Sequence, residues 1–173
     1  MRQEERRSRI MAFLAEVDRP VTGSALSSMF GVTRQVIVRD VAVLRAQGEE
    51  IIATPQGYLL PKAVPSRAHR SRVAVRHGAD RDSLAQELNL IVDLGGTVVD
   101  VSVEHPLYGE LTASLQLCSG QDVRRFVEKM EELQGEPLLV LTDGYHLHTI
   151  EAPSLEVMDQ IHAALRKVGY LVE

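Results

Sequence analysis

Two histidines lie close together near the C-terminal end of the chain, in the segment YHLHTI. His146 and His148 are two residues apart, and on an extended strand such residues point to the same side, so both imidazoles can bind one ion. Leu147 and Ile150 are then expected to face the core. A His-x-His pair suits a transition metal but needs at least one more ligand. Since most such pairs bind nothing, two ordinary polar residues on a solvent-facing strand remain the alternative.

Further metal ligands must come from other parts of the chain. The candidates are His77 at the end of a predicted strand, Glu87 in the helix that follows, and His105 in VEHPLYGE. Three histidines with a carboxylate suit zinc, nickel or iron better than calcium or magnesium, which prefer oxygen ligands. His162 lies in a predicted helix without a partner and is expected to be structural, and His69 is expected to be exposed in a linker.

The motifs of other reaction chemistries are absent from the sequence. Cys118 is the only cysteine, which excludes an internal disulfide and a cysteine-based zinc site. The sequence contains no G-x-S-x-G, P-loop, G-x-G-x-x-G or H-E-x-x-H motif. Enzymatic activity would therefore depend on a metal with open coordination positions, and no residue pattern indicates a substrate.

Composition and charge describe a globular protein with two dissimilar parts. Hydrophobic residues make up 45% and charged residues 25% of the chain, and no apolar run is long enough to span a membrane. The charged start resembles no secretion signal, so a cytoplasmic location is expected. Residues 1–60 contain eight arginines and seven acidic residues, whereas the remainder holds eleven basic and seventeen acidic residues. This asymmetry indicates two units with different partners.

The first unit, residues 1–61, is predicted to be a winged helix-turn-helix. Three amphipathic segments have the spacing of helices, with Thr22 and Thr33 as N-caps and Gly31 at the turn between the second and third. Two β-rich runs then flank a short turn at residues 55–57. Three helices followed by a hairpin are typical of this DNA-binding fold.

The third helix of this fold enters the major groove of DNA. Arginine can bind guanine through two hydrogen bonds, glutamine can bind adenine likewise, and Val38 can contact a thymine methyl group. Thr33 at the helix N-terminus suits a phosphate. The alternative is a solvated helix in a winged helix that binds protein. The predicted DNA contacts are Thr33, Arg34, Gln35, Val38, Arg39 and Arg45 on the helix, and Gln56 and Tyr58 in the hairpin.

The second unit, residues 70–173, follows a predicted linker over residues 62–69 that contains Pro65 and Ser66. It is predicted to be an α+β domain of sandwich type, with helices on one face of a mostly antiparallel sheet. Strand patterns occupy residues 70–78, 97–118 and 137–151, and helical patterns occupy residues 82–96, 119–133 and 154–169.

Several blocks of the chain together resemble the niacin-responsive transcriptional repressors of NAD biosynthesis and salvage. The blocks are GVTRQVIVRDVAVLRAQGEEIIATPQGYLL, RVAVRHG, VVDVSVEHPLYGEL and HLHTIEAP, and the resemblance covers residues 5–172. The helix-turn-helix part is common to many regulators, but VEHPLYGE and HLHTIEAP in this order are more specific. The resemblance implies a homodimeric cytoplasmic repressor of operator DNA, with nicotinic acid as co-repressor and a divalent metal, nickel or zinc, in the second unit.

The resemblance also implies roles for particular residues of the second unit. The segment between His77 and Glu87 is somewhat long for the family pattern, so Asp80 or Asp82 is the alternative carboxylate ligand. Two other functions remain open: a repressor that senses the metal itself, and a metal-dependent enzyme of pyridine carboxylates joined to a DNA-binding domain. The implied metal ligands are His77, Glu87, His146 and His148, and the implied effector contacts are His105 and Tyr108.

Overall fold

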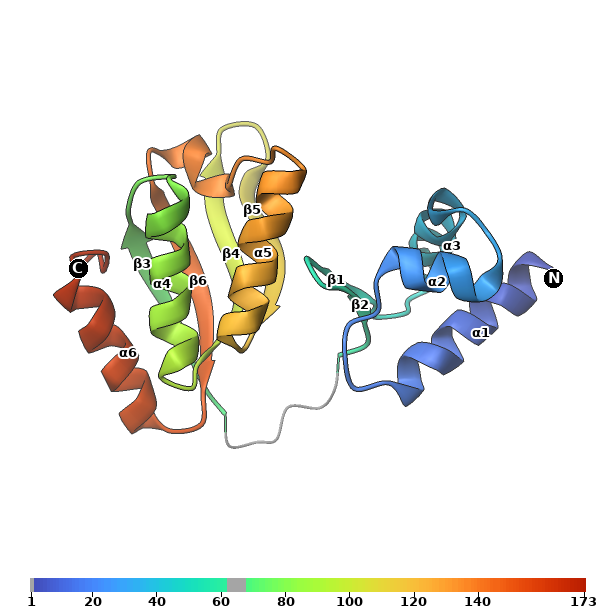
Figure 1. Ribbon diagram of the computed structural model, residues 1–173, viewed down its shortest axis with the longest axis horizontal. Helices are drawn as coiled ribbons and strands as arrows, with labels where there is room; N and C mark the ends of the chain where they lie inside the picture. Colours follow the sequence, from blue (N-terminus) through green and yellow to red (C-terminus); the bar gives the residue numbers. More distant parts are fainter. Residues whose placement is uncertain (1, 62–67) are drawn as a thin grey trace. The chain divides into compact units, whose positions relative to one another are not determined.

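The chain divides into two compact units, Met1–Ala63 and Val64–Glu173 (Figure 1). A computed structural model describes residues 2–61 and 68–173. Residues 62–67 of the predicted linker lie outside the described residues, and His69 already belongs to the first strand of the second unit. Among the described residues, no helix has both the length and the apolar character needed to cross a membrane.

The first unit has the predicted winged helix-turn-helix architecture. Val21 forms an isolated bridge with Tyr58, which attaches the segment before the second helix to the hairpin. Seven buried apolar residues from the three helices and the segment before the hairpin form the core of this unit, so each helix is amphipathic. Its elements are α1 (Gln3–Glu16), α2 (Gly23–Phe30), α3 (Arg34–Ala46), β1 (Ile52–Thr54) and β2 (Gly57–Leu59).

Side-chain caps explain where α2 and α3 begin. The hydroxyl oxygen of Thr22 accepts a hydrogen bond from the Ala25 backbone N–H at 3.0 Å, and that of Thr33 accepts one from Val36 at 3.4 Å. Gly31 ends α2 in the left-handed conformation, with a φ of 62° that glycine adopts without strain. The tight turn between the two helices is thus encoded locally, as the sequence predicts.

The second unit is a four-stranded sheet with three helices packed on it, which confirms the predicted α+β class. The strand order is β3-β6-β4-β5, and every neighbouring pair is antiparallel. Strands β3 and β4 are connected by α4 and run parallel, with β6 inserted between them. The elements are β3 (His69–Arg76), α4 (Arg81–Asp93), β4 (Thr97–His105), β5 (Gly109–Leu117), α5 (Gly120–Glu132), η1 (Leu138–Thr142), β6 (Tyr145–Ala152) and α6 (Leu155–Lys167).

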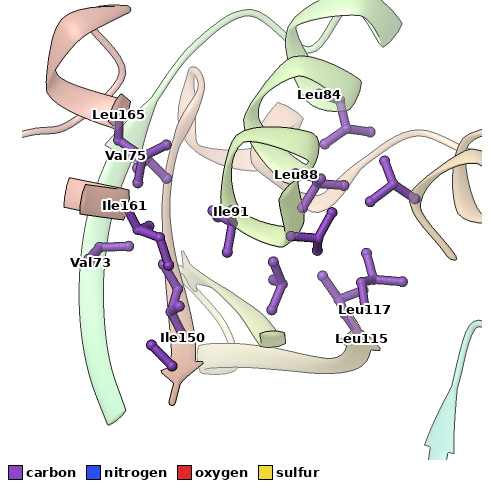
Figure 2. Packing of buried hydrophobic residues seen from close by; sticks show 14 of the residues in the cluster. Val73, Val75, Leu84, Leu88, Ile91, Leu115, Leu117, Ile150, Ile161 and Leu165 are labelled. Atoms are coloured by element: carbon purple, nitrogen blue, oxygen red, sulfur yellow. The ribbon is translucent and has the colours of Figure 1, made fainter. Parts of the chain in front are cut away.

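One hydrophobic cluster joins the helices to one face of this sheet. Figure 2 shows Leu88 of α4 and Ile161 of α6 in the same cluster as strand residues such as Ile150 and Leu117. On β6 every second residue is buried, from His146 through Ile150 to Ala152. The expectation that Leu147 and Ile150 share the core face was wrong, because residues three apart on a strand point to opposite faces. The two histidines lie on the core face with Ile150, and Leu147 lies on the other face.

The segment predicted to be one strand over residues 137–151 is divided in two by the structure. Leu138–Thr142 forms a 3-10 helix, and Leu139 inserts into the core while Val140 and Leu141 remain exposed. Asp143 and Gly144 then take left-handed backbone conformations, and the strand begins only at Tyr145. A short apolar run fits a helical turn as well as a buried strand, which explains the error.

Candidate metal site and DNA-binding surface

Three histidines surround one buried carboxylate in the second unit. Nε2 of His77 lies 2.7 Å from Oε2 of Glu87, and Nε2 of His146 lies 3.2 Å from the same oxygen. Nε2 of His148 lies 3.3 Å from the other oxygen, Oε1. We call these four residues the histidine cluster. The structure therefore brings together all four implied metal ligands, from the end of β3, from α4 and from β6.

The phase of α4 selects Glu87 as the carboxylate of the cluster. Glu87 is 0% exposed because it lies on the buried side of the helix, next to Leu84 and Leu88. Asp80 is the N-cap of α4 and accepts hydrogen bonds from the backbone N–H and the hydroxyl of Ser83, both at 2.8 Å. Asp82 is exposed in the first turn. Among the described interactions, neither alternative carboxylate forms a hydrogen bond or an ion pair with the histidine cluster.

The other ring nitrogen of each histidine in the cluster is bound to the main chain. Nδ1 of His77 donates to the carbonyl of Gly78 at 2.7 Å, that of His146 to Gly144 at 2.9 Å, and that of His148 to Asp100 at 2.7 Å. A carbonyl only accepts, so each Nδ1 bears the proton and each Nε2 of a neutral imidazole presents a lone pair to Glu87.

Three Nε2 lone pairs that face a carboxylate repel it unless a positive charge lies between them. Among the described residues, Oε1 of Glu87 and Nε2 of His148 are buried without a hydrogen-bond partner. Burial raises the pKa of Glu87, but the three histidines more than offset it, so the pKa lies well below its ordinary value. Burial lowers the pKa of His77 and His148, and Glu87 reverses this, so both pKa values are raised. Either protons or a metal ion can supply the missing charge.

The donor atoms of the histidine cluster fit a divalent transition metal. One ligand atom from each of His77, Glu87 and His146 lies within 4.8 Å of the others, and His148 faces the second carboxylate oxygen. Imidazole nitrogens with one carboxylate are the ligands of zinc and nickel sites. Backbone acceptors on each Nδ1 orient the rings as they do in known metal sites.

Gly144 occupies a tight position in the wall of this site. Its carbonyl accepts the hydrogen bond from His146, and its φ of 88° is one that residues with a side chain rarely adopt. A Cβ at this position would overlap the main-chain carbonyl oxygen of His77. Glycine at position 144 thus lets the start of β6 approach the end of β3.

The predicted effector contacts lie outside the histidine cluster. His105 is the last residue of β4 and Tyr108 lies in the turn before β5, with ring centroids 5.1 Å apart. Nδ1 of His105 accepts hydrogen bonds from the backbone N–H groups of Leu107 and Tyr108, and Tyr108 is 69% exposed. The structure brings these two residues to each other, and their effector role stays a prediction.

The outer surface of α3 presents basic and polar groups without a carboxylate. Arg34, Gln35 and Arg39 are exposed, and Val38 is half-buried between them. The only acid of α3, Asp40, is buried, and its Oδ2 lies 2.6 Å from Nε of Arg6 on α1. Helical spacing from Ile37 places position 40 on the inner face, so the burial of Asp40 is a feature that the sequence pattern itself contains.

Two predicted DNA contacts, Arg45 and Tyr58, also have partners within the first unit, and a third, Gln56, has a buried side-chain nitrogen. Nε of Arg45 donates to the carbonyl of Ile51 at 2.8 Å, which ties α3 to the hairpin. Tyr58 packs half-buried against the core, and its backbone pairs with Val21. Nε2 of Gln56 is buried without a hydrogen-bond partner among the described residues. These residues position the hairpin, and contact with DNA stays a prediction for them.

Comparisons with known proteins match both units. Residues 70–173 match the 3H domain, and residues 6–59 match a helix-turn-helix (HTH) domain. The chain is 44% identical over 173 residues to the probable transcription repressor NiaR of Thermotoga maritima, covering 99% of this chain and 95% of the relative. It is 41% identical over 170 residues to the transcription repressor NadR of Bacillus subtilis, covering 97% and 93%.

Proposed function

The chain belongs to the family of 3H-domain proteins with an N-terminal helix-turn-helix domain, and we propose that it is a transcription repressor with nicotinic acid as its co-repressor. Its target genes would be those of NAD biosynthesis and niacin salvage, bound by a homodimer that holds a divalent metal in each 3H domain. The relatives are named transcription repressors, which indicates a regulator and not an enzyme.

The exposed face of α3 is the observation that supports DNA binding most directly. Arg34 and Arg39 offer donors in the geometry that guanine accepts, and Gln35 offers the pattern for adenine. Asp40 lies on the inner side of α3, where it pairs with Arg6, so no carboxylate on the outer face of α3 repels the phosphates. A homodimer would place two such helices in half-sites about 34–36 Å apart.

The histidine cluster supports a resident metal. His77, Glu87, His146 and His148 would hold the ion, whose positive charge would satisfy the buried carboxylate and offer a binding position to an anionic effector. The chain supplies the orientation, because backbone carbonyls fix all three imidazoles. Nicotinate then acts as co-repressor only if it binds the DNA-competent state of the protein more tightly than the other state.

The experiment that tests this function separates the two signals. A duplex selected from a random pool by the nickel-loaded or zinc-loaded protein in nicotinate would be titrated, with metal varied at fixed nicotinate and then the reverse. We expect operator affinity to rise with nicotinate only when metal is present. A response to metal that nicotinate does not alter would identify a metal-sensing repressor and contradict the co-repressor role.

Replacement of Arg34 by alanine is expected to weaken operator binding by about 1–3 kcal/mol, because a guanine contact is lost from the exposed end of α3. Fluorescence anisotropy with the selected duplex and with a random duplex measures the effect. Loss of affinity for the selected duplex alone supports a base contact. An equal loss for both duplexes would make Arg34 a phosphate contact, and no loss would exclude it from the interface.

A further inference from the structure

We propose that the effector pocket is a cavity of about 740 Å³ beside the histidine cluster, and that it binds a small planar aromatic carboxylate. This proposal rests on the proposed function, and it names the place where the co-repressor would bind. The volume lies in the range of small-molecule sites in proteins. The lining residues that matter most are Arg76, His77, Val140, Tyr145, Tyr170 and Leu171.

The C-terminal residues of the chain build one wall of this cavity. The backbone N–H of Arg76 donates to the carbonyl of Tyr170 at 2.8 Å, and that of Val172 donates to Ala74 at 2.9 Å. Leu171 forms an isolated bridge with Val75. The segment after α6 therefore adds to the edge of β3 and holds Tyr170 and Leu171 beside the end of that strand.

His77 belongs to both the cavity and the histidine cluster. The ring of Tyr170 lies 4.8 Å from the His77 ring, tilted by 41°, on the cavity side. The Tyr170 hydroxyl donates to the side chain of Gln86 at 2.6 Å, next to Glu87 on α4. The His77 side chain is almost fully buried, so a ligand in the cavity would lie beside His77 while its Nε2 faces the buried carboxylate, and occupancy of the cavity and of the cluster can influence each other.

The rim of the cavity supplies the group that would recognise a carboxylate. The Arg76 guanidinium lies over the Tyr145 ring, 4.8 Å from its centroid, and Nη2 lies 3.2 Å from Oδ2 of Asp143. Since Asp143 is highly exposed, water weakens this ion pair and a ligand carboxylate can compete for the remaining guanidinium donors. Two parallel N–H···O bonds from Arg76 would favour the acid over its neutral amide.

The remaining walls suit an aromatic ring. Val140 and Leu171 provide apolar surface, and Tyr145 and Tyr170 provide two aromatic side chains at the same cavity. His105 and Tyr108 do not line it. The cavity therefore combines one cation, apolar walls and contact with the histidine cluster, which together match a pyridine or benzene carboxylate.

Calorimetric titration of nicotinate and nicotinamide into the nickel-loaded full-length protein tests this assignment. We expect the wild type to bind nicotinate more tightly than nicotinamide, and Arg76→Gln to lower the nicotinate affinity by about tenfold or more while the nicotinamide affinity stays the same. Arg72→Gln is the matched control, because Arg72 is an exposed arginine on the same strand that pairs with Glu110 and does not line the cavity.

Three outcomes are decisive. An acid preference that disappears in Arg76→Gln and persists in Arg72→Gln, with equal nickel content, supports the cavity as the pocket. Nicotinate binding that survives Arg76→Gln but is lost in His105→Ala or Tyr108→Ala would overturn the cavity assignment and leave the co-repressor role standing. No nicotinate binding to the metal-loaded wild type would overturn the proposed function and the pocket together.

Discussion

Replacement of Glu87 by glutamine is expected to lower the affinity of the protein for nickel or zinc by at least about a hundredfold. Loss of a residue that only hydrogen-bonds a metal ligand already lowers metal affinity by about 10–100-fold, and Glu87 would itself be a ligand. Glu87 is completely buried, and its two oxygens face the Nε2 atoms of His77, His146 and His148. Glutamine preserves the shape but removes the negative charge. If the metal is needed for nicotinate binding, the variant also loses its response to nicotinate in the operator assay.

Asp82→Asn is the matched control for Glu87→Gln. Asp82 lies on the same helix, is exposed, and is the alternative ligand that the sequence leaves open. Competition against a coloured chelator would give the metal affinity of both variants. Near-normal affinity in Glu87→Gln, together with a large loss in Asp82→Asn, would show that the metal is held elsewhere than in the histidine cluster.

Replacement of Asp40 by alanine is expected to reduce the free energy of unfolding of the first unit by about 3 kcal/mol. Asp40 is 2% exposed, and its carboxylate binds Nε and Nη2 of Arg6 at 2.6 and 3.3 Å, with Nη1 of Arg7 at 3.9 Å. Alanine would leave the buried Arg6 guanidinium without its counter-ion. The loss also loosens α1 from α3, so operator binding should weaken although position 40 does not face DNA.

Glu5→Ala provides the control for Asp40→Ala, since Glu5 forms an exposed ion pair with Arg9 on α1. Such pairs contribute about 0–1 kcal/mol, so its unfolding curve should stay close to that of the wild type. Urea unfolding followed by far-ultraviolet circular dichroism measures both variants, with hydrogen exchange in α1 and α3 locating the change. Equal stability of the two variants would mean that the Arg6–Asp40 pair does not stabilise the unit.

The features that could be predicted from the sequence are those encoded over a few residues. Thr22, Gly31 and Thr33 mark helix ends through local hydrogen bonds and backbone preference, so the helix-turn-helix follows from them directly. Amphipathic spacing likewise predicts α4 through α6 and the two-layer fold. The resemblance to a family supplied the four cluster residues, which spacing alone left open.

Features that depend on distant contacts could not be predicted in this way. Leu138–Thr142 is apolar enough for a strand, and only the packing of Leu139 into the core makes it a helical turn. Histidines on a strand are ordinarily expected to face water. His146 and His148 are buried because their strand pairs with core strands, and the local sequence does not show this pairing. The cavity beside them requires the C-terminal segment to meet β3, a contact between residues nearly a hundred positions apart.

The requirement for glycine at position 144 can be detected by genetics in the 3H domain. Any amino acid other than glycine would bring a Cβ against the carbonyl oxygen of His77, and the positive φ would strain it as well. In a library of single substitutions at every position, only glycine should therefore be functional at residue 144, whereas the exposed neighbour Tyr145 should tolerate many amino acids. If the protein is the proposed repressor, alleles at this codon would derepress the target genes although every residue of α3 is unchanged, and they would map to the part of the gene that encodes the 3H domain.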